Sequence, residues 1–179
     1  MKKLYSVILV LLLTATVSFA QGYQKDSKVL NAGVGFGLYG MDGSATLPPI
    51  SAGLQFGITD KISAGGIIGI AGSSYDFGSW YGKDYSWSYT YIIIGARGEY
   101  HYLEPENKLD AYGGVTLGYT IVNVSEPDGW EGYGYSATGS YALYGFHAGA
   151  RYALTPSIGV FGELGYGIGY FTVGATFKL

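Results

Sequence analysis

The chain has 179 residues, of which 31 are glycine and 19 are tyrosine, while charged residues make up only 13%. This length fits one domain, the lack of cysteine excludes disulfide bonds, and the high apolar and aromatic content excludes intrinsic disorder. Five prolines are too few for a collagen-like or proline-rich chain.

Residues 1–20 have the features of a signal peptide. Lys2 and Lys3 form a positive start, 7–13 is an apolar run, and 18–20 reads Ser-Phe-Ala, a small-residue cleavage site. The run is shorter than the roughly 20 apolar residues of a spanning helix. We therefore expect a mature domain of 21–179. Its net charge of −5, from eight basic and thirteen acidic residues, argues against nucleic acid as a partner.

The mature chain alternates apolar and small or polar residues with period two, which indicates β-strands. The clearest example runs from Leu30 to Leu38, where every second residue is apolar and the residues between are mainly glycine. No apolar run is long enough for a membrane helix. Eight such segments are predicted, at 30–39, 50–58, 62–70, 92–102, 110–121, 142–152, 159–168 and 171–179.

The links between these segments alternate in length. Short links are expected at 59–61, 103–108 and 154–157, and longer ones at 40–48, 72–88 and 122–140, with a very short last link at 167–169. Outer-membrane barrels are built with short periplasmic turns and long extracellular loops. The pattern therefore predicts an all-β, eight-stranded antiparallel up-and-down transmembrane barrel with both termini on the periplasmic side.

The apolar faces carry large side chains, and the opposite faces carry mainly glycine and a few charges. An eight-stranded barrel encloses only enough space for side chains, and small and large residues alternate to fill it. We therefore expect the apolar face to meet lipid and the other face to fill the interior. The charged and histidine residues predicted to face inward are Arg97, Glu99, His101, Asp110, His147, Arg151, Glu163 and Lys178.

Aromatic residues fall near both ends of the predicted strands, as expected for belts at the two membrane interfaces. Near the short links these are Tyr100, Tyr102, Tyr152 and Phe177; near the long links they are Tyr91, Tyr119, Tyr144, Tyr166 and Phe171. Tyrosine also favours β structure in general, which explains its abundance but not this placement.

In this strand–turn–strand–loop rhythm the whole mature chain resembles the small OmpA/OmpX-type outer-membrane barrels. Segments 95–102 and 162–167 look like strands of that family, and 173–179 is similar to its C-terminal insertion signal, although Leu179 stands where an aromatic residue is usual. The resemblance implies an outer-membrane location in a Gram-negative bacterium, contact with lipid and lipopolysaccharide, and insertion by the barrel-assembly machinery. Because the chain stops at the last strand, an envelope-tethering role through a peptidoglycan-binding domain is not expected.

Two interpretations of the interior charges are open. They form either an ion path or catalytic cluster, or a network of salt bridges that locks the barrel. The narrow interior favours the network, with Arg97 and Arg151 paired to Glu99 and Glu163. The acidic residues of the loops match no calcium-loop spacing, so neither a metal nor a cofactor is predicted.

The expected function is a structural or cell-surface interaction role in the outer membrane, without catalysis, by a monomer. One alternative is adhesion or capture of an extracellular ligand through 72–88 and 122–140, whose aromatic and glycine-rich composition suits binding. The other is a lipid A-modifying enzyme; a soluble periplasmic barrel is the main structural rival. The loop aromatics proposed for binding are Trp80, Tyr81, Tyr85, Trp87, Trp130, Tyr133 and Tyr135.

Overall fold

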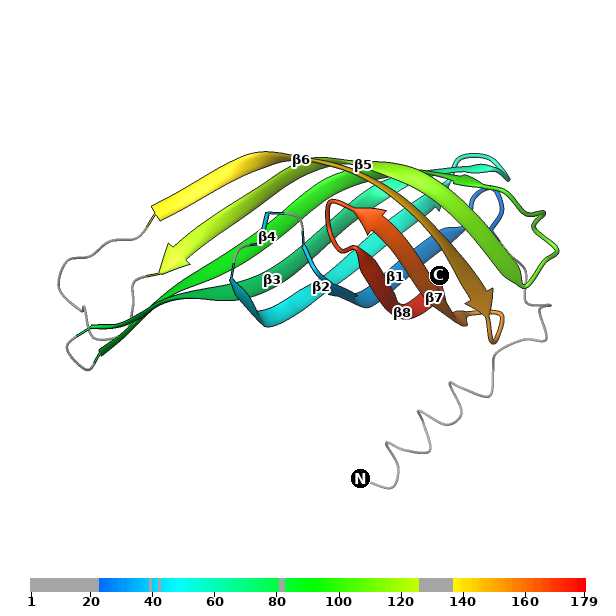
Figure 1. Cartoon of the computed structure of the whole chain (residues 1–179). Coiled ribbons are helices and arrows are strands. Elements are labelled where there is room, and N and C mark those ends of the chain that lie inside the picture. The colour runs from blue at the N-terminus through cyan, green and yellow to red at the C-terminus, as the bar shows by residue number, and fades with distance from the viewer. Residues whose placement is uncertain (1–22, 39, 42, 81–82, 126–136) are drawn as a thin grey trace, which may run out of the picture.

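The protein forms a closed barrel of eight antiparallel strands in sequence order (Figure 1). The structure is a computed structural model and describes residues 23–38, 40–41, 43–80, 83–125 and 137–179. Pairing of the first strand with the last closes the sheet, which confirms the predicted up-and-down barrel. The strands are β1 Lys28–Phe36, β2 Ser44–Gly57, β3 Ile62–Trp80, β4 Lys83–His101, β5 Leu109–Ser125, β6 Ala137–Ala153, β7 Ile158–Tyr166 and β8 Phe171–Lys178.

The ends of the chain bear on two of the predictions. The predicted signal peptide at 1–20 lies outside the described residues. Within the described part of the chain, no helix has the length and apolar character needed to cross a bilayer. The start of β1 and the end of β8 lie together at the short-turn end of the barrel, where the Leu179 amide donates to the Lys28 carbonyl.

The outer face of the barrel is its apolar face. Large apolar side chains stand exposed there, among them Phe36 at 59%, Ile68 at 59% and Leu117 at 64% relative exposure. Polar and charged side chains such as Gln55 and Glu99 are buried inside. This is the reverse of a water-soluble barrel, and it is the arrangement that the alternating sequence pattern predicts.

The strands differ greatly in length. β3 and β4 have 19 residues each and β5 and β6 have 17, whereas β1 and β7 have nine and β8 has eight. In Figure 1 the β3–β4 and β5–β6 hairpins therefore reach well beyond the ends of β1, β7 and β8.

This corrects the predicted long loops. The link expected at 72–88 is mostly strand, because the β3–β4 ladder continues from Gly72↔Thr90 to Trp80↔Lys83. Residues 122–125 and 137–140 likewise belong to β5 and β6, and 44–48 to β2. The apolar alternation used for the prediction ends where the apolar band ends, but backbone pairing continues because serine, threonine and tyrosine also suit strands.

The barrel interior has two layers. Towards the long-link end it is filled by a buried apolar cluster, with Leu38, Ala71, Tyr91, Ile93 and Leu143 packed together. Towards the short-turn end it is polar and charged. Tyr91, predicted to lie in the outer aromatic belt, instead belongs to the inner cluster at 2% exposure, because Ile92 takes the outward position beside it.

Candidate functional site

Glu99 lies at the centre of the polar layer, and its side chain is fully buried. The strand alternation of β4 points Glu99 inward together with Arg97 and His101. Its carboxylate accepts from Arg151 of β6 at 2.6 Å and from Gln55 of β2 at 3.1 Å. Arg97 Nε lies 3.8 Å away and His147 Nε2 3.5 Å away. One carboxylate thus ties three strands together across the interior.

Arg151 joins Glu99 to a second carboxylate. Its guanidinium donates to Asp110 of β5 at 2.9 Å and stacks over the Tyr112 ring, with Cζ 3.8 Å from the ring centre. The Asn31 side-chain amide is oriented by its hydrogen-bond partners. Its oxygen accepts from Arg151 at 3.0 Å, and its nitrogen donates to the Thr176 hydroxyl. The guanidinium group of arginine is planar and holds its N–H donors in a fixed arrangement, which allows it to bind several acceptors at once.

Arg97 also pairs with Glu163 of β7, with Nη2 and Oε1 2.9 Å apart. The Tyr112 hydroxyl donates to the same carboxylate at 3.1 Å. Interior glycine makes room for these groups: a Cβ at Gly149 would lie 2.7 Å from the Tyr112 hydroxyl oxygen. Large polar side chains therefore occupy the space that glycine leaves on the neighbouring strand.

His101 is held on both sides. Its Nδ1 lies 2.8 Å from Asp110 Oδ1, and its Nε2 lies 3.0 Å from Ser63 Oγ. Tyr23, from the segment before β1, stacks on the imidazole with ring centres 3.8 Å apart and planes 8° from parallel. Burial raises the pKa of Tyr23 to about 12.

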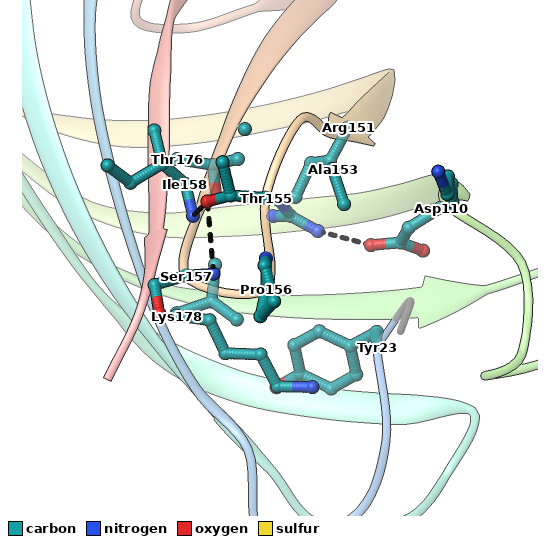
Figure 2. Close-up of a pocket in the computed structure, with 13 residues that line it drawn as sticks. Tyr23, Asp110, Arg151, Ala153, Thr155, Pro156, Ser157, Ile158, Thr176 and Lys178 are labelled. Carbon is teal, nitrogen blue, oxygen red and sulfur yellow. Dashed lines mark hydrogen bonds and ion pairs between the residues drawn. The ribbon is translucent and has the colours of Figure 1, made fainter. Parts of the chain in front are cut away.

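Tyr23 also lines a small pocket at the short-turn end of the barrel (Figure 2). Thr155, Pro156 and Ser157 of the β6–β7 turn line the pocket, and so do the buried Asp110 and Arg151. Lys178, predicted to face the interior, lines this pocket together with Lys108. The structure thus joins seven of the eight predicted interior residues in one cluster, and Lys178 lines the adjoining pocket.

A metal ion is poorly suited to the cluster. Glu99, His147 and Glu163 bring ligand atoms within 4.8 Å of one another. Both carboxylates, however, already bind guanidinium groups, and those positive charges oppose a bound cation. The residues of the cluster therefore do not fit a metal ion.

Sequence reasoning did not single out the uncharged members of the cluster, Tyr23, Asn31, Gln55 and Ser63. The inward positions of the last three could be found from the same alternation, since each is flanked by outward apolar residues. Four of the seven loop aromatics proposed for binding lie outside the described residues: Tyr81, Trp130, Tyr133 and Tyr135. Trp80 and Tyr85 fall within β3 and β4, and Trp87 is half-buried on β4.

Three solved structures that this chain resembles are outer-membrane barrels. The chain matches OprG of Pseudomonas aeruginosa with a TM-score of 0.60 at 11% identity, over 88% of this chain and 98% of that one. The N-terminal barrel domain of P. aeruginosa OprF matches with a TM-score of 0.55 at 12% identity, over 87% and 98% of the two chains.

A third match is Ail of Yersinia pestis, the attachment invasion locus protein, solved with the heparin analogue sucrose octasulfate. Its TM-score is 0.54 at 12% identity, over 86% of this chain and 97% of that one. No family model matches the chain, and no curated protein sequence does. The likeness confirms the predicted resemblance to small eight-stranded outer-membrane barrels at the level of the fold.

Proposed function

We propose that the protein is an integral outer-membrane barrel with a structural or surface-interaction role. The observation that carries this proposal is the inverted distribution of side chains. Isoleucine, leucine and valine cover the outside of a closed sheet, while arginine and glutamate are buried within it. Exposing such a surface to water is unfavourable, whereas a bilayer solvates it. The filled interior supports a role other than solute passage.

The first test is gel mobility of the detergent-solubilised membrane fraction, with and without boiling. A closed barrel resists unfolding by detergent, so the unboiled and boiled forms should migrate differently. Recovery of the protein in the soluble periplasm, without a mobility difference, would mean that the barrel is not a membrane protein.

Surface interaction is favoured by the extended sheet of β3–β6. Among the described residues, β6 pairs with β7 only from Phe146 onwards, so 137–145 have a strand partner only in β5. A Cβ added at Gly139 would meet nothing within 4 Å. An unpaired strand edge is a template for binding an extended segment of a partner.

The charge of the extended region argues for a particular kind of partner. The 122–140 segment carries Glu126, Asp128 and Glu131 without a basic residue, and 72–88 carries two acidic residues and one lysine. A polysulfated ligand of the kind bound to Ail would be repelled by this charge. We therefore propose a neutral or basic protein partner. Both histidines are buried inside the barrel, away from its lipid-exposed face, so modification of lipid A at that face is not proposed.

This proposal is tested by shortening the β3–β4 hairpin. Residues 77–85 are replaced by Asn-Gly, which joins the paired residues Asp76 and Ser86 by a tight turn. Cells that produce the full or the shortened protein are compared for adhesion to a panel of immobilised matrix proteins. We expect lost adhesion with an unchanged boiling-dependent mobility shift. Equal adhesion by both would mean that the end of the β3–β4 hairpin does not contact the partner.

A further inference from the structure

We propose that Ser63, His101 and Asp110 form a serine nucleophile inside the barrel that accepts acyl groups from activated carboxylic esters. Ser63 Oγ lies 3.0 Å from His101 Nε2, and His101 Nδ1 lies 2.8 Å from Asp110 Oδ1. A hydroxyl, an imidazole and a carboxylate in this order are the arrangement that activates serine as a nucleophile. The three residues come from β3, β4 and β5, so the barrel register brings them together.

The hydrogen-bond partners fix the roles of the two imidazole nitrogens. A carboxylate oxygen accepts hydrogen bonds, so Nδ1 of His101 donates to Asp110; in the tautomer with its proton on Nδ1, the Nε2 lone pair faces the Ser63 hydroxyl. The second carboxylate oxygen of Asp110 accepts from Arg151 at 2.9 Å, which holds the carboxylate in place. The imidazole is thus oriented as a general base towards Ser63.

The reaction is an acyl transfer. The Ser63 oxygen bonds to the ester carbonyl carbon while its proton passes to His101 Nε2. The bond between the carbonyl carbon and the leaving oxygen then breaks, and the imidazolium returns the proton to the departing alcohol. Water, activated by the same imidazole, hydrolyses the serine ester to a carboxylic acid and restores Ser63.

Tyr23 covers this group. Ser63 is 1% exposed and His101 is fully buried under the Tyr23 ring. A turn holds the ring in place: the Asp26 amide donates to the Gly57 carbonyl at 3.0 Å, and Asp26 has a φ of 63°. With Tyr23 in this position, solvent does not reach the Ser63 hydroxyl.

The pocket beside Tyr23 defines the access route and the class of ester. Tyr23 and Asp110 both line it (Figure 2). His101 lies directly behind these two residues, so withdrawal of the tyrosine ring would open the pocket towards His101 and Ser63. Lys108 and Lys178 line the same pocket. An ester that carries a negative charge therefore fits this site best.

The test is labelling of the detergent-folded mature protein by a neutral alkyl fluorophosphonate. In this reaction the Ser63 oxygen bonds to phosphorus, fluoride leaves, and His101 takes the proton. The variant Tyr23→Ala uncovers the site, and Ser63→Ala is added to remove the nucleophile. Ser73→Ala is the matched control, because Ser73 lies on the same strand and is also 1% exposed.

We expect Tyr23→Ala to be labelled, the label to be lost with Ser63→Ala, and labelling to be retained with Ser73→Ala. Adding His101→Gln to Tyr23→Ala should slow labelling about 100-fold, since it removes the base but keeps a donor for Asp110. The boiling-dependent mobility shift verifies that each variant is folded. If Tyr23→Ala does not fold, Tyr23→Leu takes its place, because it keeps apolar bulk without a flat stacking surface.

Three outcomes would overturn the proposal. These are a folded, uncovered barrel that is not labelled, labelling that survives the loss of Ser63, and labelling whose rate does not depend on His101. Ester preference is measured with 4-nitrophenyl esters on the uncovered barrel, as the initial release of nitrophenolate. A hydrogen succinate ester should react faster than the neutral butyrate ester; the reverse order would contradict the assigned class of ester.

Discussion

At the scale of single residues, the buried charges are stable only as a set. Two guanidinium groups lie among three carboxylates, and Glu99 contacts both arginines. Removing one partner from a buried ion pair leaves the other charge without compensation in a medium that solvates it poorly. The cost of a substitution should therefore depend on burial far more than on the distance between the charges.

Glu99→Ala and Glu104→Ala test this dependence. Glu104 pairs with Lys61 at 2.6 Å, as close as Glu99 and Arg151, but its side chain is 68% exposed. We expect Glu99→Ala to lower the free energy of unfolding by about 3–5 kcal/mol and Glu104→Ala by about 0–1 kcal/mol. Urea unfolding in lipid vesicles, followed by tryptophan fluorescence, measures both. Equal losses would contradict the dominant role of burial.

Glycine at the contact between two strands is a second residue-scale constraint. Gly118 pairs with Gly95, and a Cβ at Gly118 would overlap the Ile94 carbonyl oxygen. Gly118→Ala should therefore lower the free energy of unfolding by roughly 1–3 kcal/mol. Gly162→Ala is the control, because a Cβ there meets nothing within 4 Å, and it should leave stability unchanged or raise it by about 0.4–1 kcal/mol. The same unfolding measurement compares them.

At the scale of strands, period-two alternation predicts the number and order of the eight strands and most of their inward and outward positions, but Tyr91 and Leu38, expected on the outer face, lie in the inner cluster. It does not predict how far β3 to β6 continue, because the alternation follows the apolar band and the pairing does not. It also places Arg97, Glu99 and Arg151 inside but cannot pair Ser63 with His101, which are 38 residues apart. That pair can be found only from the strand register, which places Ser63 opposite Glu99. His101 lies two residues further along β4 on the same face and is therefore the diagonal neighbour of Ser63.

The extent of the apolar band can be measured with arginine substitutions on one face of the sheet. Ile68 is 59% exposed and pairs with Ala52, which pairs with Ala32 at the middle of β1. Ile68→Arg should lower the free energy of unfolding in lipid by about 2–4 kcal/mol. Ser88→Arg, on the extended part of β4, should have no measurable effect. A similar loss at both positions would mean that the band includes the extended strands.

At the scale of the whole molecule, the unequal strands give the barrel two different ends. The short-turn end carries the start of β1, the end of β8 and the pocket beside Tyr23, while the opposite end carries the extended β3–β6 sheet. If the barrel spans the outer membrane in the usual orientation, the extended sheet faces the outside of the cell and the pocket faces the periplasm. The proposed surface role and the proposed nucleophile would then act in different compartments.

The orientation can be read directly because the chain contains no cysteine. Thr138→Cys places a thiol on the exposed, extended part of β6, and Ser157→Cys places one in the exposed β6–β7 turn. A bulky, membrane-impermeant maleimide should label Thr138→Cys in intact cells and Ser157→Cys only after the outer membrane is permeabilised. The opposite pattern would place the extended sheet in the periplasm, where it could not contact a partner outside the cell. It would also turn the pocket beside Tyr23 towards extracellular esters, so the labelling pattern decides which compartment supplies a ligand to each end.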